Sequence, residues 1–165
     1  MDWVTFGAQW LHVIFGITWF GYSLAMAIFI IPALNRLPIP VQRQFGTALG
    51  ARTEPIIDVL APTIIVLGVI RGTFLGPIDS VEEVFTTAYG ITWLVALIAT
   101  TAVYLWSRFV IFPAVARMNA APLTAEGGPT PELDAAIATA KGVVILELIG
   151  FLVIFTCMIL MRFGL

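Results

Sequence analysis

Apolar residues fill four long segments of this chain, at about residues 8–34, 56–75, 84–112 and 142–161. Within each segment the apolar residues are continuous, whereas the strands of a membrane barrel alternate apolar and polar positions. Each segment approaches or exceeds the roughly 20 residues that cross a bilayer as a helix, and a helix satisfies its own backbone groups in lipid. The pattern therefore predicts an all-α fold: one domain, residues 1–165, forming a four-helix transmembrane bundle.

Prolines and polar residues mark the connections between these segments. Pro38 and Pro40 are expected to stop the first helix. Residues 41–51 are expected to form a short, separate amphipathic helix at the membrane interface. Thr130 followed by Pro131 is a typical cap and first turn, which predicts a helix leading into the fourth segment.

Basic residues predict the orientation in the membrane, because Lys and Arg accumulate in cytoplasmic connections. The connection at 76–83 is short and acidic. We therefore expect a multi-pass protein of the cell (inner) membrane with both termini and this acidic connection on the non-cytoplasmic side. The basic residues of the first and third connections are Arg36, Arg43, Arg52, Arg117 and Lys141, with Arg108 just before the third.

A short internal repeat relates the first and third segments. The sequence GITW at 16–19 recurs at 90–93, and a proline exit follows each copy, at Pro32 and Pro113. Two tandem helix pairs related by an axis along the membrane normal would explain this. In the GITW register the position that matches His12 is Thr86, so the repeat predicts one imidazole site rather than two.

Composition and charge support a membrane protein and exclude some functions. The chain is 60% hydrophobic and 11% charged, against about 25% charged residues in a soluble domain. A net charge of −2 gives no basic footprint for nucleic acid. Cys157 is the one cysteine, so neither an internal disulfide nor a cysteine metal cluster is expected. The expected partners are the lipid bilayer and, within it, other membrane subunits or further copies of the chain.

His12 is the strongest candidate for chemistry, because it is the only histidine and lies in the uncharged stretch Trp10–Leu34. One interpretation is an interfacial side chain like that of Trp10. The other is an axial ligand of haem iron or a copper ligand, since imidazole is the commonest metal-binding side chain and ionisable residues in spans are often functional. Gly16, one turn further, would let a flat macrocycle approach the helix.

Two more residues complete the predicted cofactor site. Arg71 is expected at the same end of the bundle as His12, where it either snorkels and pairs with an acid of residues 76–83 or binds a haem propionate. Trp19 either packs in the bundle or flanks a haem face. The predicted cofactor-binding residues are thus His12, Arg71, Trp19 and Gly16, with His12 as the metal ligand.

Acidic side chains form a second polar group at the expected cytoplasmic ends of the helices. Asp58 and Glu147 lie there, within reach of three basic residues. They are expected either to form structural ion pairs or to belong to a proton path. The basic candidates are Arg52, Arg108 and Lys141.

The first apolar segment resembles a known superfamily. His12, Trp19 and Gly21 form the pattern H-x6-W-x-G, which is similar to the first helix of HemJ-type protoporphyrinogen oxidases and CopD-like membrane proteins. The resemblance covers mainly residues 10–34 and implies haem b bound by His12. The HemJ-type lysine that opens the third helix has no match in residues 84–92, so the resemblance does not extend to that position.

The leading hypothesis from the sequence is a cytochrome-like haem b protein in electron transfer or haem-linked redox chemistry, with enzymatic activity left open. The alternative of another class is a non-catalytic membrane subunit packed in a larger complex. CopD-like copper handling and protoporphyrinogen oxidase activity are weaker alternatives. For copper, Met26, Met158 and Met161 are expected to lie too scattered to form a track of soft ligands with His12.

Overall fold

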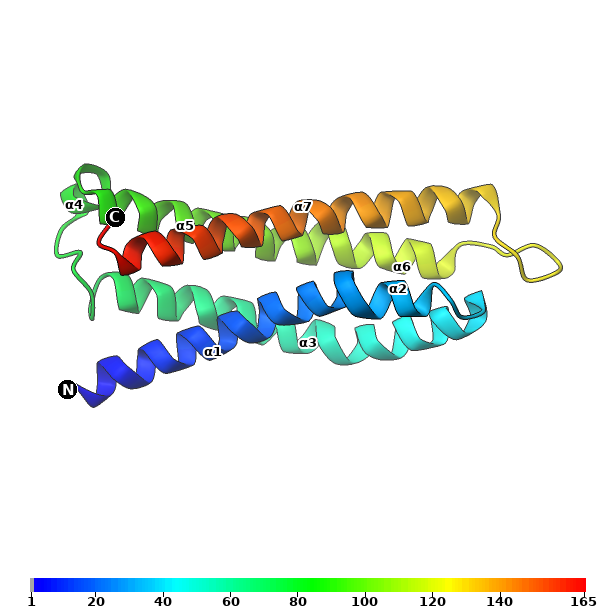
Figure 1. Ribbon diagram of the computed structural model, residues 1–165, viewed down its shortest axis with the longest axis horizontal. Coiled ribbons are helices and arrows are strands. Elements are labelled where there is room, and N and C mark those ends of the chain that lie inside the picture. The colour runs from blue at the N-terminus through cyan, green and yellow to red at the C-terminus, as the bar shows by residue number, and fades with distance from the viewer. Residues whose placement is uncertain (1) are drawn as a thin grey trace.

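The computed structural model describes residues 2–165 as four long helical rods lying side by side, with the N- and C-termini at one end (Figure 1). We call this the terminal end, and the opposite end, with the connections at 35–38 and 121–130, the loop end. The rods are α1 (Trp3–Ala25), η1 (Met26–Ile30) and α2 (Ile31–Leu34); α3 (Ile39–Gly72); α5 (Ala88–Trp106), η2 (Ser107–Ile111) and α6 (Phe112–Ala120); and α7 (Pro131–Arg162), with α4 (Val81–Thr86) before the third.

Each rod is long and apolar enough to cross a membrane. Rods of 32 to 34 residues measure about 50 Å at 1.5 Å per residue, so their ends extend beyond a hydrocarbon core of about 30 Å. Large apolar side chains point outward along the rods, such as Phe109, which is 69% exposed. The predicted all-α bundle is confirmed, and by helix length and composition the chain is a multi-pass membrane protein.

The second rod corrects two predictions. It begins at Ile39 rather than near residue 56, and residues 41–51 are its first turns instead of a separate helix. Pro40 stands in the first turn, where backbone N–H groups have no partner within the helix, so its missing N–H costs no hydrogen bond. Pro55 lies inside the helix, which continues through it. The guanidinium of Arg43 donates to the carbonyl of Ala121 at 2.6 Å, which fastens this extension to the neighbouring connection.

Pro113 does not end its helix, although the predicted segment stops at residue 112, and Pro32, which lies inside the predicted segment 8–34, does not interrupt its rod either. Each stands second in a further helical segment, which follows a five-residue π-helix, η1 or η2. Both π-helices begin six residues before the proline, so an offset of 81 residues relates the two rods. This common irregularity agrees with an internal repeat. When the two π-helices are aligned, His12 matches Trp93. The GITW alignment matches His12 instead to Thr86, which lies two helical turns earlier in the sequence.

The remaining helix ends follow local capping chemistry. Thr130 accepts a hydrogen bond from the Leu133 amide at 3.3 Å, which confirms the predicted cap, and α7 starts at Pro131, before the predicted residue 142. Asp2 caps α1 at Trp3, and the hydroxyl of Thr5 donates to this carboxylate and lowers its pKa. The predicted segment 84–112 is divided, because the backbone is extended at Thr87 between α4 and α5.

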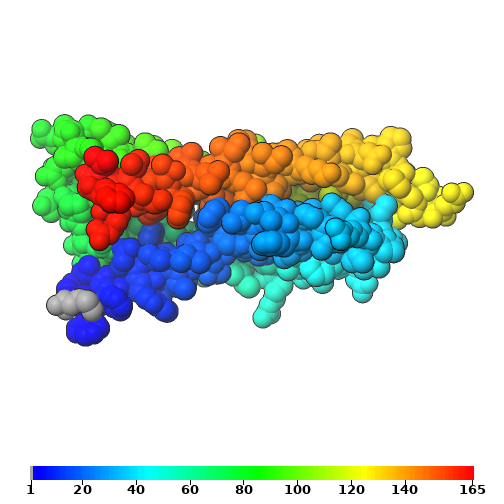
Figure 2. Space-filling model, viewed as in Figure 1, coloured from blue at the N-terminus to red at the C-terminus, as the bar shows by residue number. Residues whose placement is uncertain are grey.

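The core lies midway along the bundle, where all four rods meet. Ala61 of α3 is 0% exposed and Trp19 of α1 is 3% exposed. The indole of Trp19 meets the ring of Phe151 of α7 edge-on, with centroids 5.0 Å apart, a geometry that aromatic pairs favour. Figure 2 shows that α1 and α7 separate from this contact toward the terminal end. The core thus leaves one cavity on each side of it.

Gly150 tests the packing of α5 against α7, because a Cβ there would overlap the side chain of Val103. We expect Gly150→Ala to lower the free energy of unfolding in mixed micelles by about 1–3 kcal/mol, the usual cost of overpacking. Gly142→Ala is the matched control on the same helix, since a Cβ there meets nothing within 4 Å. Equal stability of the two variants would contradict this packing.

Candidate functional site

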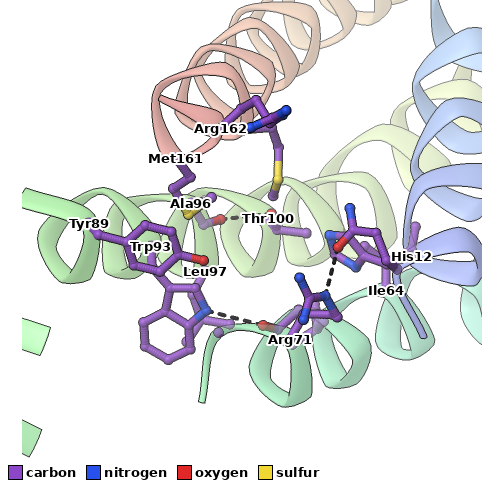
Figure 3. A pocket seen from close by; sticks show the side chains of 15 residues that line it. His12, Ile64, Arg71, Tyr89, Trp93, Ala96, Leu97, Thr100, Met161 and Arg162 are labelled. Atoms are coloured by element: carbon purple, nitrogen blue, oxygen red, sulfur yellow. Dashed lines mark hydrogen bonds between the residues drawn. The ribbon is translucent and has the colours of Figure 1, made fainter. Parts of the chain in front are cut away.

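A cavity of about 360 Å³ opens between the rods near the terminal end. All four long helices contribute to its wall, as Figure 3 shows in close-up. We call it the terminal-end cavity. Its polar and aromatic lining residues are Gln9 and His12 of α1, Arg71 of α3, Tyr89, Trp93 and Thr100 of α5, and Met158, Met161 and Arg162 of α7.

His12 enters this cavity against the surface of α3. The space it needs comes from Gly68, where a Cβ would stand 3.3 Å from the imidazole Cε1 atom. The Nδ1 atom of His12 is buried and has no hydrogen-bond partner among the described residues. This nitrogen faces α3, near the backbone of Ile64, and the imidazole as a whole lines the cavity.

Trp93 approaches the same part of α3 from the other side. Its Nε1 donates to the carbonyl of Gly68 at 3.1 Å, and a Cβ at Gly72 would overlap its indole ring. The glycines at 68 and 72 therefore let His12 and Trp93 lie close to the backbone of α3. Trp93 is not among the site residues that the sequence predicts. The sequence feature that could have indicated the position of Trp93 is the 81-residue offset between Pro32 and Pro113, because the same offset matches Trp93 to His12.

Arg71 lines the cavity together with His12, as the sequence predicts. Its Nε donates to Gln9 Oε1 at 2.7 Å and its Nη1 to the carbonyl of Leu75 at 2.5 Å. The first bond joins α3 to α1 across the cavity mouth, as the dashed line in Figure 3 shows. The described partners of the guanidinium are thus an amide and a backbone carbonyl, where the sequence suggested an acid of residues 76–83.

The other two predicted cofactor residues lie elsewhere. Trp19 is buried in the core and borders the second cavity, toward the loop end. Gly16 is half-buried, and a Cβ added there meets nothing within 4 Å, so no neighbouring helix packs on it. Seven residues separate His12 from Trp19, which is about 10 Å along the helix. The structure therefore brings together His12 and Arg71 but not Trp19 and Gly16.

Two methionines join the site. Met158 and Met161 line the terminal-end cavity from α7, because residues three apart share one face of a helix. Met26 borders the second cavity. Two of the three methionines thus share a cavity with His12, and the expectation that the three form no track of soft ligands with it stays a prediction. Among the described residues no three of His, Cys, Asp or Glu gather as metal ligands, so a metal ion here would depend on His12 and thioether sulfur.

The acidic residues take separate roles. Asp58 forms the predicted ion pair, with its Oδ1 atom 3.4 Å from Arg108 Nε. Glu147 is only 7% exposed and accepts a hydrogen bond of 2.5 Å from the hydroxyl of Ser107. The ion pair predicted for Glu147 is replaced by this neutral partner.

In comparisons with known proteins, no protein-family model, curated protein or solved structure matches this chain. The resemblance to HemJ-type and CopD-like proteins stays a prediction from the first-helix motif.

The contact between Gly72 and Trp93 can be tested by a double-mutant cycle. We expect Gly72→Ala to destabilise the protein by about 1–3 kcal/mol, because the new methyl group displaces the indole. In the background of Trp93→Ala the same substitution should cost almost nothing, since the space is vacant. Unfolding free energies of the four proteins measure the coupling. Additive effects of the two substitutions would contradict the contact.

Proposed function

We propose that this chain is a membrane-embedded haem b protein in which His12 is an axial ligand. The observation that supports the proposal is the half-buried imidazole of His12, which lines a cavity within the bundle together with Arg71. A neutral imidazole binds haem iron in many proteins. Bound haem would supply one-electron redox chemistry, which favours a role in electron transfer or a haem-linked redox reaction.

The residues around His12 fit such a group by their chemistry. Arg71 offers a guanidinium for a propionate carboxylate, and Met158 or Met161 offers a thioether on the facing helix, as in His/Met haem ligation. The aromatic rings of Tyr89 and Trp93 would exclude water from the ligand. A cavity of about 360 Å³ falls at the lower end of the usual range for ligand pockets, about 300–1,000 Å³.

Copper(I) is a second candidate for the same site. One imidazole and two thioethers line a single cavity through His12, Met158 and Met161, and soft thioether sulfur selects Cu(I). This observation favours copper handling more than the sequence alone does. Haem remains the first proposal because the guanidinium of Arg71 can bind a haem propionate, whereas it would repel a bare copper cation.

The orientation belongs to the same proposal. Both termini lie at the end that holds the terminal-end cavity, and the basic connections lie at the other end. The bias of Lys and Arg toward the cytoplasm therefore directs the cavity to the non-cytoplasmic side of the cell membrane.

The absorption spectrum of the purified protein tests the ligand. We expect wild-type protein, expressed with ample haem and purified in detergent, to show a Soret band that shifts on reduction. His12→Ala should lose this band, because it removes the nitrogen donor. Thr18→Ala, an exposed position on the same helix, should keep it.

Two other outcomes would contradict haem binding. A colourless wild type that binds Cu(I), with binding lost in His12→Ala and weakened in Met158→Leu, would assign the cavity to copper. A wild type that binds neither would leave the role of a non-catalytic membrane subunit.

Cysteine labelling tests the orientation. In a Cys157→Ser background, Asp79→Cys should react with a membrane-impermeant thiol reagent on intact cells, because the proposal puts the connection at 76–83 outside. Glu126→Cys, in the exposed connection at the loop end, should react only after lysis. The reverse pattern would overturn the orientation.

A further inference from the structure

A second and larger cavity, of about 540 Å³, lies between the rods on the loop side of the core. We call it the loop-end cavity. Most of its lining is apolar, and all four rods contribute to it. Both π-helices face it, through Met26 and Ala27 of η1 and Ser107 and Ile111 of η2. Single-turn π-helices inside α-helices occur frequently at functional sites.

The polar centre of this cavity is the pair Glu147 and Ser107. Glu147 of α7 is 7% exposed, and its Oε1 atom accepts the Ser107 hydroxyl at 2.5 Å. The partner is neutral, and a buried charge without a counter-ion is costly. We therefore take the carboxyl as neutral, a form that offers a ligand both an O–H donor and an acceptor oxygen.

The charges around the cavity favour a neutral ligand. Two basic side chains, Arg43 and Lys141, also line it, against one acidic side chain besides Glu147, that of Glu54. Lys141 precedes Glu147 by six residues, about 9 Å along the helix. A cationic amine at Glu147 would meet the field of these two basic side chains, and an anionic lipid phosphate held by them would leave Glu147 and Ser107 unused.

We propose that the loop-end cavity binds a lipid-soluble quinone or its quinol. Such a molecule is neutral, reaches the cavity through the bilayer, and carries carbonyl or hydroxyl oxygens on a flat ring with an apolar tail. One quinone oxygen accepts a hydrogen bond from the neutral Glu147 carboxyl, which Ser107 holds in place. The ring packs among apolar and aromatic side chains such as Trp19 and Phe112, and the tail follows the apolar wall. Binding here does not require haem or copper at His12, since that residue lines the other cavity.

Photolabelling tests the site directly. Protein in phosphatidylcholine nanodiscs is irradiated with an azido-benzoquinone that carries a decyl tail, and the labelled peptides are mapped. We expect label in residues 22–27, 107–115 or 144–148, displaced by excess unlabelled decyl-benzoquinone. Glu147→Leu should lower the labelling about tenfold, as loss of a buried hydrogen bond predicts. Glu132→Gln, on the same helix but absent from the cavity lining, and His12→Ala should label like wild type.

A second variant keeps the proposal testable if Glu147→Leu does not fold. Ala27→Phe fills the cavity from η1 without touching Glu147, and it should abolish the same label. Label that maps elsewhere, or that persists in Ala27→Phe, would overturn the proposal. The proposal would also be overturned if another competitor displaced the label as effectively as decyl-benzoquinone does. Displacement by decanol would show that the site selects an alkyl chain, by dodecylamine a cation, and by phosphatidylglycerol an anion.

Discussion

The structure depends on one constraint, that backbone polar groups in lipid must be paired within the protein. Because of it three of the four rods stay helical through prolines that would end a helix in water. Pro55 and Pro62 lie inside α3, and Pro32 and Pro113 follow π-helices that shift the register of the backbone bonds. Polar side chains that cannot face lipid then gather inside, on either side of the core around Trp19.

The polar sites in the two cavities depend on close approach of the helices. Gly68 and Gly72 remove side chains from one face of α3, so that His12 and Trp93 can lie against its backbone. Around the other cavity, η2 carries Ser107 to within hydrogen-bonding distance of Glu147. Each end of the bundle thus holds a few polar groups in an apolar interior. A bound redox group at one end and a quinone at the other, each of which stands as a proposal, would fit one electron-transfer protein.

The sequence predicts the spans well because membrane crossing requires long apolar runs, and four of them were evident. It fails at the start of the second rod, because outside the hydrocarbon apolarity no longer marks a helix, and the polar turns from Ile39 were assigned to a separate short helix. At the fourth rod the Thr130-Pro131 cap indicated the helix start that apolarity did not. His12 and Arg71 were predicted together from depth alone. The place of Met158 at the cavity was not predicted, and of the two roles left open for Trp19 the structure shows packing in the bundle. Which face of a helix meets a cavity depends on the rotation of that helix, and a helix that is apolar on all sides does not specify this rotation.

The central claim is that His12 presents a metal-binding nitrogen inside the bundle. X-ray absorption at the iron and copper edges of the purified protein tests it most directly, because the spectrum reports the atoms bound to the metal. The account predicts a stoichiometric metal whose nearest shell includes an imidazole nitrogen, which is lost in His12→Ala. Absence of both metals from protein prepared with ample supply, or an identical shell in the two proteins, would contradict it.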